Sequence, residues 1–209
     1  MLNPADHTYT GLISGLPRRS VTTVLAEEGW IDKRFYREGF QDLGTQVHRL
    51  LHAHDKGLRF TAPAIYMRYL TPWQAFLKHL NAEVVGSEEE VEDLSLGVSG
   101  QLDRLLRVPG HGVGLLDIKI SSCGYMYWHE LQTEAYRQAL IHHPKYKDLR
   151  VDWRGGIILG PDCEMPKLIN HDRDPNVSRI WQATAISNAA KHQRRAVLPE
   201  ISSEEGWLP

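Results

Sequence analysis

The sequence has few cysteines, no excess of one charge and no long apolar run. Its 209 residues include two cysteines, Cys123 and Cys163, which are too few for a disulfide scaffold or a four-cysteine zinc site and are typical of a reducing compartment. No stretch approaches the ~20 apolar residues of a membrane-spanning helix, and the first residues lack the apolar core of a signal peptide. We therefore expect a cytoplasmic protein without a membrane partner.

Basic residues are not in excess either. The 24 lysines and arginines are balanced by 26 aspartates and glutamates, which leaves a net charge of −2 at pH 7 with histidine neutral. Proteins that bind nucleic acid usually show a basic excess, so the overall charge gives no indication of such a partner. A nucleic-acid function would therefore have to rest on a local site.

What the sequence does contain is the composition of one globular domain. Hydrophobic residues make up 42% and charged residues 24%, close to the average of soluble domains, which excludes a chain that is disordered throughout. We expect a single domain over residues 1–196 and a loosely held acidic tail over residues 197–209.

Hydrophobic periodicity predicts the order of the elements. Residues 1–20 are expected to be irregular because of their glycines and prolines, and Ser20 or Thr22 is expected to cap a short helix. This order of elements predicts an α/β domain with a central mixed β-sheet flanked by helices. The expected helices cover about 33–54 (ending near Gly57), 63–80 (broken at Pro72), 125–140 and 177–193, and the expected strands 83–91, 96–108, 113–120, 150–159 and 164–170.

Two aspartates flank a Pro-Gly-His-Gly turn between two of the expected strands. A hairpin centred on Gly110 places Asp103 opposite Asp117, because the two positions are equally far from it. Opposed residues on one face of a sheet have Cβ atoms about 4.5–5.5 Å apart. Lys119 follows Asp117 by two residues and so points to the same side, whereas Ile118 points toward the core. One face thus gathers two carboxylates and an ammonium group.

Two carboxylates beside a lysine suit the metal-dependent hydrolysis of phosphodiesters. Carboxylate oxygens hold Mg²⁺ or Mn²⁺, which neutralises a phosphate and lowers the pKa of a bound water. A lysine beside the metal can orient or deprotonate that water. The alternative is an Asp–Lys–Asp charge cluster on a solvated sheet face, and this segment by itself does not separate the two.

Two further pairs are spaced one helical turn apart. Gln132 and Tyr136 share a face of the helix after the Asp-x-Lys strand, where they would present an amide and a phenol to the carboxylates or to a nucleic-acid strand. The alternative for them is a packed tyrosine and an exposed glutamine. Gly44 permits the close approach of another backbone one turn before His48, which is a candidate metal ligand; its alternative is a structural histidine.

Taken in chain order, these residues resemble the PD-(D/E)XK nuclease superfamily, in its RecB-like, phage-type exonuclease branch. The segment LPRRSVTTVL, residues 16–25, is also similar to the opening of phage-encoded members and of the mitochondrial genome maintenance exonucleases. The resemblance covers residues 8–193 and implies a restriction-endonuclease-like αβββαβ core with N-terminal helical elements. The matching motifs are Gly44/His48, Glu88, Gly100/Asp103, Asp117/Lys119 and Gln132/Tyr136.

The resemblance also implies roles for these residues around one or two Mg²⁺ or Mn²⁺ ions. Lys119 would act on the attacking water, while Gln132 and Tyr136 would orient the site or contact the substrate. Glu88 matches the early carboxylate of the family, although it stands in an acidic run that has a solvated surface as its alternative role. The metal ligands would be Asp103, Asp117, His48, Glu88 and the Ile118 carbonyl.

The opening segment would contact DNA, since hydroxyls and backbone amides at a helix start bind phosphates. It is two residues longer than the usual opening of the family, which puts this role in question. A second departure is Leu102, which stands where the superfamily name has proline. The residues concerned in the opening are Arg18, Arg19, Ser20, Thr22 and Thr23.

Other side chains are weaker candidates for contacts with nucleic acid. Trp73, Trp128 and Tyr125 are candidate stacking platforms for bases, with the protein core as the alternative. Arg104 is among the arginines that would supply positive charge to the DNA backbone, with an ordinary surface charge as the alternative.

The implied function is the hydrolysis of DNA from single-stranded or duplex ends, in phage or recombination and repair processing. An endonuclease on the same core and a non-catalytic DNA-binding subunit are the alternatives. Members with an iron–sulphur cluster hold it through four cysteines, so no cluster is expected here. The compartment would be the cytoplasm of a prokaryotic or phage-infected cell, and a homo-oligomer or a recombination partner protein stays open.

Overall fold

The computed structural model describes residues 2–3, 8–32, 40–120, 126–161 and 163–197. The expected beginning of a helix at residue 33, the candidate stacking residue Tyr125 and residues 198–209 of the expected tail lie outside these ranges, while Val197, the first residue of that tail, ends a helix. Within them, no helix is both long enough and apolar enough to cross a membrane.

Within the described ranges, a mixed β-sheet of eight strands forms the centre of the fold. Its order is β1-β2-β3-β5-β6-β7-β8, with β4 paired to β5, and the β3–β5 and β6–β7 pairs are parallel while the others are antiparallel. The predicted fold class, a central mixed sheet flanked by helices, is therefore confirmed. The strands are β1 (Leu2–Asn3), β2 (Thr8–Thr10), β3 (Pro17–Ser20), β4 (Glu83–Asp93), β5 (Val98–Val108), β6 (Gly112–Lys119), β7 (Trp153–Ile158) and β8 (Leu168–Asn170).

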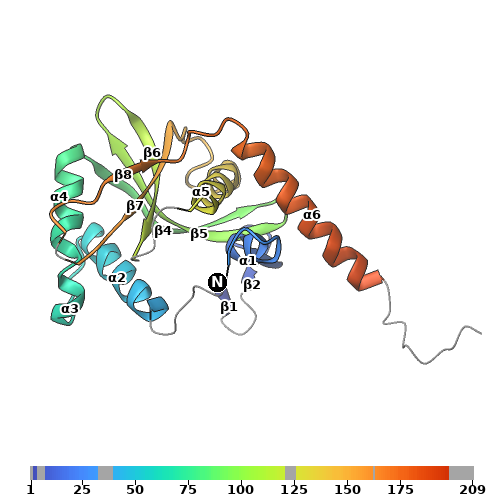
Figure 1. The fold of residues 1–209 in the computed structure, drawn as a ribbon, viewed down its shortest axis with the longest axis horizontal. Helices are drawn as coiled ribbons and strands as arrows, with labels where there is room; N and C mark the ends of the chain where they lie inside the picture. The colour runs from blue at the N-terminus through green and yellow to red at the C-terminus, as the bar shows by residue number, and fades with distance from the viewer. Residues whose placement is uncertain (1, 4–7, 33–39, 121–125, 162, 198–209) are drawn as a thin grey trace, which may run out of the picture.

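Helices cover both faces of the sheet (Figure 1). One group is α2, α3 and α4, and the other is α1, α5 and α6, with a short 3-10 turn after α5. Their bounds are α1 (Val21–Glu27), α2 (Phe40–Asp55), α3 (Ala64–Met67), α4 (Leu70–Leu80), α5 (Trp128–Ala139), the 3-10 turn (Leu140–His142) and α6 (Val177–Val197).

The alternation of side chains along β5 and β6 creates two hydrophobic cores. Leu105 and its neighbour Leu115 face the group of α1, α5 and α6, where they pack in one core. Leu106 and Leu116 face α2 and α4 and belong to the other. Both central strands are thus buried on both faces, which holds the sheet firmly between the two helical layers.

The expectation that residues 1–20 are irregular was wrong. β2 and β3 form an antiparallel ladder, and β3 pairs in parallel with Val98 and Ser99 of β5. Strands of two to four residues are too short to show a period, so only their ladder partners define them. The prediction that Ser20 caps a helix is confirmed, because its hydroxyl accepts a hydrogen bond from the Thr23 N–H at 2.9 Å.

The helix expected over residues 63–80 is broken, but not at Pro72. Met67 ends α3, with Arg68 as its C-cap, and Leu70 begins α4 after its N-cap Tyr69, so Pro72 lies in the first turn of α4. A proline is tolerated there because the first N–H groups of a helix have no partner within it. The predicted end of α2 near Gly57 is confirmed, since this residue has a φ of 63° and donates to the His54 carbonyl.

One edge of β5 is shared by two strands. β4 pairs with residues 98–102 and 104–107 along the opposite edge, while β3 pairs with residues 98–99 and β6 with residues 104–108. Residues 100–103 lie between these two ladders. The alternation of β5 also shifts here, because Leu102 and Leu105 lie in the same core although they are three residues apart. Opposite this shift Glu88 of β4 has a φ of 52°, which is rare for a residue with a side chain.

Gly100 and Gly44 offer a matched pair of substitutions. A Cβ on Gly100 would lie 2.5 Å from Cε1 of the buried Tyr136 ring, whereas a Cβ on Gly44 meets nothing within 4 Å, so the expected close approach at Gly44 is not seen among the described residues. We expect Gly44→Ala to stabilise the protein by roughly 0.5–1 kcal/mol, since glycine is unfavourable inside a helix. Gly100→Ala should destabilise it by about 1–3 kcal/mol through overpacking. Urea unfolding measures both, and equal effects of the two changes would contradict the packing described.

Candidate functional site

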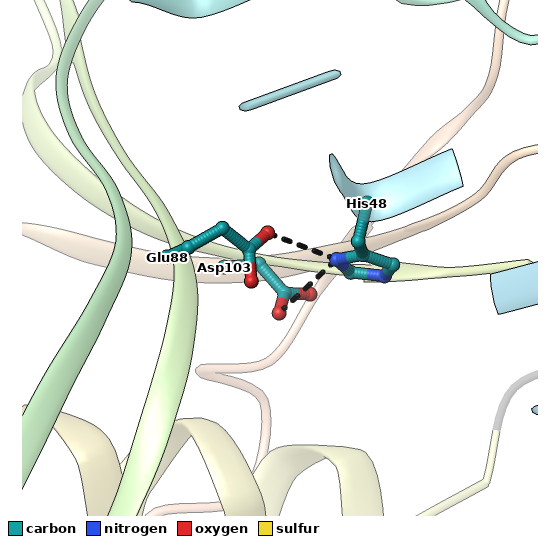
Figure 2. Close-up of side chains that lie close together, drawn as sticks. All are labelled: His48, Glu88 and Asp103. Carbon is teal, nitrogen blue, oxygen red and sulfur yellow. Dashed lines mark hydrogen bonds and ion pairs between the residues drawn. The ribbon is translucent and has the colours of Figure 1, made fainter. Parts of the chain in front are cut away.

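Three side chains from three different elements meet at the shift in β5. They are His48 of α2, Glu88 of β4 and Asp103 of β5, and one ligand atom from each lies within 4.8 Å of the other two (Figure 2). His48 Nδ1 is 3.0 Å from Glu88 Oε1 and 3.7 Å from Asp103 Oδ1. An imidazole and two carboxylates at such separations are a donor set for a divalent metal ion.

The second nitrogen of His48 is also engaged. Nε2 lies 3.0 Å from the Ile118 carbonyl oxygen, to which it donates a hydrogen bond. This bond favours the tautomer that leaves Nδ1 directed at Glu88 and Asp103. The Ile118 carbonyl, expected as a metal ligand, accepts this bond in the structure.

The charges of the three residues are strongly coupled. Burial disfavours a charged His48 ring, but the carboxylates of Asp103 and Glu88 outweigh burial and raise the pKa of His48 to about 9. Burial also raises the pKa of Asp103, to about 6. The negative charges of Asp117 and Glu88 act in the same direction, whereas the positive charge of His48 lowers this pKa. Without a metal ion, the imidazolium of His48 helps to compensate the charge of these carboxylates.

A second group of side chains lies on the α5 side of the sheet. The Lys119 ammonium donates to Asp117 Oδ1 and to Gln132 Oε1, both at 2.8 Å. The Gln132 amide in turn donates to the Tyr136 hydroxyl at 3.0 Å. The residues of the Asp-x-Lys and Gln-x-x-x-Tyr motifs are thus joined in one chain of hydrogen bonds. Gly100 leaves room for the Tyr136 ring at the end of this chain.

Asp103 connects the two groups. Its Oδ2 accepts a hydrogen bond of 2.6 Å from the backbone N–H of Ile118, the residue between Asp117 and Lys119. The ladder of β5 and β6 ends beside it at the pair Arg104↔Leu116, in the register expected from the sequence. The predicted register is therefore confirmed as far as this pair, but the ladder does not extend to Asp103 and Asp117, and Asp117 is not a member of the cluster of three.

Asp117 has an incomplete set of partners. Its Oδ2 is buried and has no hydrogen-bond partner among the described residues. Burial raises its pKa, but the charge of Lys119 and its hydrogen bond more than offset this, so the pKa lies below its usual value and the group is an anion. A buried carboxylate oxygen without a partner is costly. Because oxygen is the ligand that Mg²⁺ and Mn²⁺ prefer, the residues present fit a divalent cation here.

The two histidines beside Asp117 are neutral at pH 7. Burial lowers the pKa of His129 to about 3 and that of His171 to about 4, and the charge of Lys119 acts in the same direction on both. They therefore surround Asp117 with polar rings rather than with charge.

The opening segment forms contacts within the protein. The Ser20 hydroxyl caps α1 and also bonds to the hydroxyls of Thr22 and Thr23, at 3.1 and 2.7 Å. Arg18 Nε lies 2.7 Å from a carboxylate oxygen of Glu92. The Arg19 guanidinium bonds to Glu27 and Asn188. Their proposed role in binding DNA has no support from these contacts.

Two weaker candidates for nucleic-acid contact were wrong. Trp73 is fully buried, so it offers no surface on which a base could stack. Arg104 is also fully buried and bonds to Asp55 and Glu88, so it cannot reach a DNA backbone. Trp128 is half-buried, and its ring lies 5.0 Å from the Lys119 ammonium, a cation–π contact.

Sequence reasoning missed several residues of the site. Asp55 reaches the site through Arg104, and His171 lies near Asp117, although both are distant from these partners in the sequence. Tyr9 lies near the site as well, because its pKa is raised by burial and also by the charges of Glu90 and Glu88. Short strands such as β2 carry no signal for such a placement. Arg104 did have one, because it lies two residues before Leu106 in a strand that is buried on both faces.

Comparison with known proteins gives distant structural likenesses. No protein-family model matches this sequence, and no curated protein matches it. A candidate exonuclease of Eubacterium rectale is similar over 77% of this chain and 69% of its own, with 14% identity and a TM-score of 0.46. LHK-Exo, solved in complex with dAMP, is similar over 85% and 89%, with 13% identity and a TM-score of 0.42. At these values neither likeness carries an argument about activity, which has to rest on the site.

The pKa values at the cluster predict that metal binding depends on pH. Below pH 9 an ion must displace the proton of His48, and below about pH 6 that of Asp103 as well. We therefore expect the affinity for Mn²⁺ to rise about tenfold per pH unit between these two values, and more steeply below them. Titration calorimetry in buffers of different ionisation enthalpy should show the release of about one proton at pH 7.5. His48→Ala is the control that should abolish this release, and an affinity independent of pH would contradict the assignment.

Proposed function

We propose that this chain is a metal-dependent nuclease that hydrolyses phosphodiester bonds of DNA. The observation that carries the proposal is the joining of two groups at one backbone position: Asp103, from the cluster with His48 and Glu88, accepts the N–H of Ile118 between Asp117 and Lys119. A metal-ligand set and a fixed lysine side by side are what phosphodiester hydrolysis requires.

The residues that would hold the ion are His48, Glu88 and Asp103, with Asp117 supplying an oxygen from the other side. The donors are mostly carboxylate oxygens, which favours Mg²⁺ or Mn²⁺ over softer metals. When bound, such an ion would supply charge neutralisation for a phosphate and acidify water. The single His48 nitrogen is compatible with Mn²⁺ in particular.

Lys119 would position the attacking water. Its ammonium is held from two sides, by Asp117 and by Gln132, and its place over the Trp128 ring restricts it further. Tyr136 fixes Gln132 in turn and is itself buried. A donor held in this way loses little freedom when it orients a water molecule, which is the advantage of a preorganised site.

DNA is proposed as the substrate because of the motifs. The order of Gly-x-x-Asp, Asp-x-Lys and Gln-x-x-x-Tyr resembles the RecB-like exonucleases, and each of these motifs lies at the site described. The same resemblance favours attack from DNA ends, with either Mg²⁺ or Mn²⁺, in phage or recombination and repair processing. Because the chain has no excess of positive charge, a bound divalent ion would supply the local positive charge that attracts the phosphate backbone.

Substitutions at the Asp-x-Lys motif test the activity. Asp117→Asn and Lys119→Met should each lower Mn²⁺-dependent hydrolysis of end-labelled DNA by about 10²–10⁴-fold, since both remove a group that acts on the reacting atoms. Lys167→Met is the matched control and should keep full activity, because Lys167 is an exposed lysine that belongs to neither group of site residues. Full activity in both site variants would show that this is not the catalytic centre.

The form of the DNA distinguishes attack at ends from attack within the strand. We expect linear single-stranded or duplex DNA to be degraded, while covalently closed circular DNA stays intact because it has no end. Gel electrophoresis after incubation with Mn²⁺ resolves the two. Nicking or cutting of the circle would make the protein an endonuclease, and metal-dependent binding without any hydrolysis would make it a non-catalytic DNA-binding subunit.

A further inference from the structure

A buried arginine lies directly behind the cluster of three. The Arg104 side chain is 0% exposed, and its Nη1 donates to Glu88 Oε1 at 2.6 Å and to the Asp103 carbonyl at 2.7 Å. Arg104 therefore touches both acidic residues of the cluster.

The guanidinium is itself fixed by residues of α2 and α4. Its Nε donates to Asp55 Oδ2 at 2.5 Å, and the Asp55 side chain is also 0% exposed. Asp55 Oδ1 accepts a hydrogen bond of 2.8 Å from Trp73 Nε1. The guanidinium carbon lies 5.7 Å from the centre of the Trp73 ring, a cation–π contact. Trp73, Asp55 and Arg104 thus form a rigid support.

Glu88 needs such a support. Its φ of 52° is in the left-handed region, where residues with side chains are disfavoured and persist only when their surroundings hold them. Arg104 Nη1 and His48 Nδ1 both bond to the same carboxylate oxygen, Oε1. Among the described residues, Oε2 is consequently the oxygen of Glu88 left for an ion.

Charge also gives Arg104 a part in the cluster. Asp55, Glu88 and Asp103 carry three carboxylates that lie close together, and the guanidinium compensates one of them. The two negative charges that remain are matched by a single divalent ion. A lysine at this position would keep the charge but lacks the planar fork that bridges two carboxylates.

We propose that Arg104 is a positioning residue of the metal site, which holds the Glu88 carboxylate toward His48 and Asp103 through its bond to Asp55. The inference rests on the proposed function, because it concerns the same metal ion. Arg104 would act on the affinity for the ion through Glu88, and on catalysis through the ion.

The affinity of the full chain for Mn²⁺, measured by titration calorimetry without DNA, tests the inference. Arg104→Lys should weaken Mn²⁺ binding by about 10-fold to 100-fold, the usual effect of losing a residue that orients a metal ligand. Arg107→Lys is the matched control on the same strand, since Arg107 is 56% exposed and pairs only distantly with Glu83, and it should bind as the unmodified protein does. Equal affinity of Arg104→Lys and Arg107→Lys would overturn the inference.

A double-mutant cycle separates positioning from a general structural role. In a Glu88→Gln background, Arg104→Lys should change the affinity by no more than about twofold, because its path to the ion is already broken. An equally large loss in both backgrounds would mean that Arg104 only supports the fold. If Arg104→Lys does not fold, Asp55→Asn takes its place in the same cycle with the same two outcomes.

The failure of the proposed function gives a different result. If the unmodified protein binds no Mn²⁺, or binds it equally well after Asp103→Asn, the metal site itself is wrong and the inference falls with it. Binding that depends on Asp103 but not on Arg104 overturns the inference alone.

Discussion

The site depends on one hydrogen bond, from the Ile118 N–H to the Asp103 carboxylate. The backbone ladder between β5 and β6 ends at the pair Arg104↔Leu116. Just beyond it, the Asp103 side chain takes the place of a backbone carbonyl as the partner of the β6 N–H. Asp103 is thereby held between two layers, with His48 of α2 on one side and the Asp117–Lys119 pair on the other. The shift in the alternation of side chains along β5 makes this geometry possible. In a regular strand the Asp103 side chain would point to one face of the sheet and could not contact groups of both layers.

Buried charge is the second constraint. Most carboxylates of the site have a cation of the protein beside them: Arg104 for Asp55 and Glu88, Lys119 for Asp117, and His48 for Asp103. Unpaired charges in such an environment would cost several kcal/mol each. The imbalance that remains is local, namely the partnerless oxygen of Asp117 and the raised pKa of Asp103. Both lie where an added cation would restore the balance.

Part of this arrangement could be predicted from the sequence. The turn around Gly110 sets the register of β5 and β6, and the strand and helix periods place Lys119 and Gln132 on facing elements, because these features are local. The conformation of Glu88 could not be predicted, since nothing in an acidic run indicates a positive φ. The burial of Arg104 depends on Asp55, which is 49 positions away, and such pairings appear only once the layers have packed.

The distance between these residues along the chain has a consequence for folding. His48 and the Ile118 carbonyl that orients it are 70 positions apart, and they meet only when α2 has docked on the finished sheet. An unfolded chain therefore presents no equivalent site, and an ion that binds here binds the native state alone. Its binding free energy adds to the stability of the domain, by about 2.7 kcal/mol at a concentration one hundred times its dissociation constant. The supply of free metal in its surroundings would then help to set the fraction of the protein that is folded.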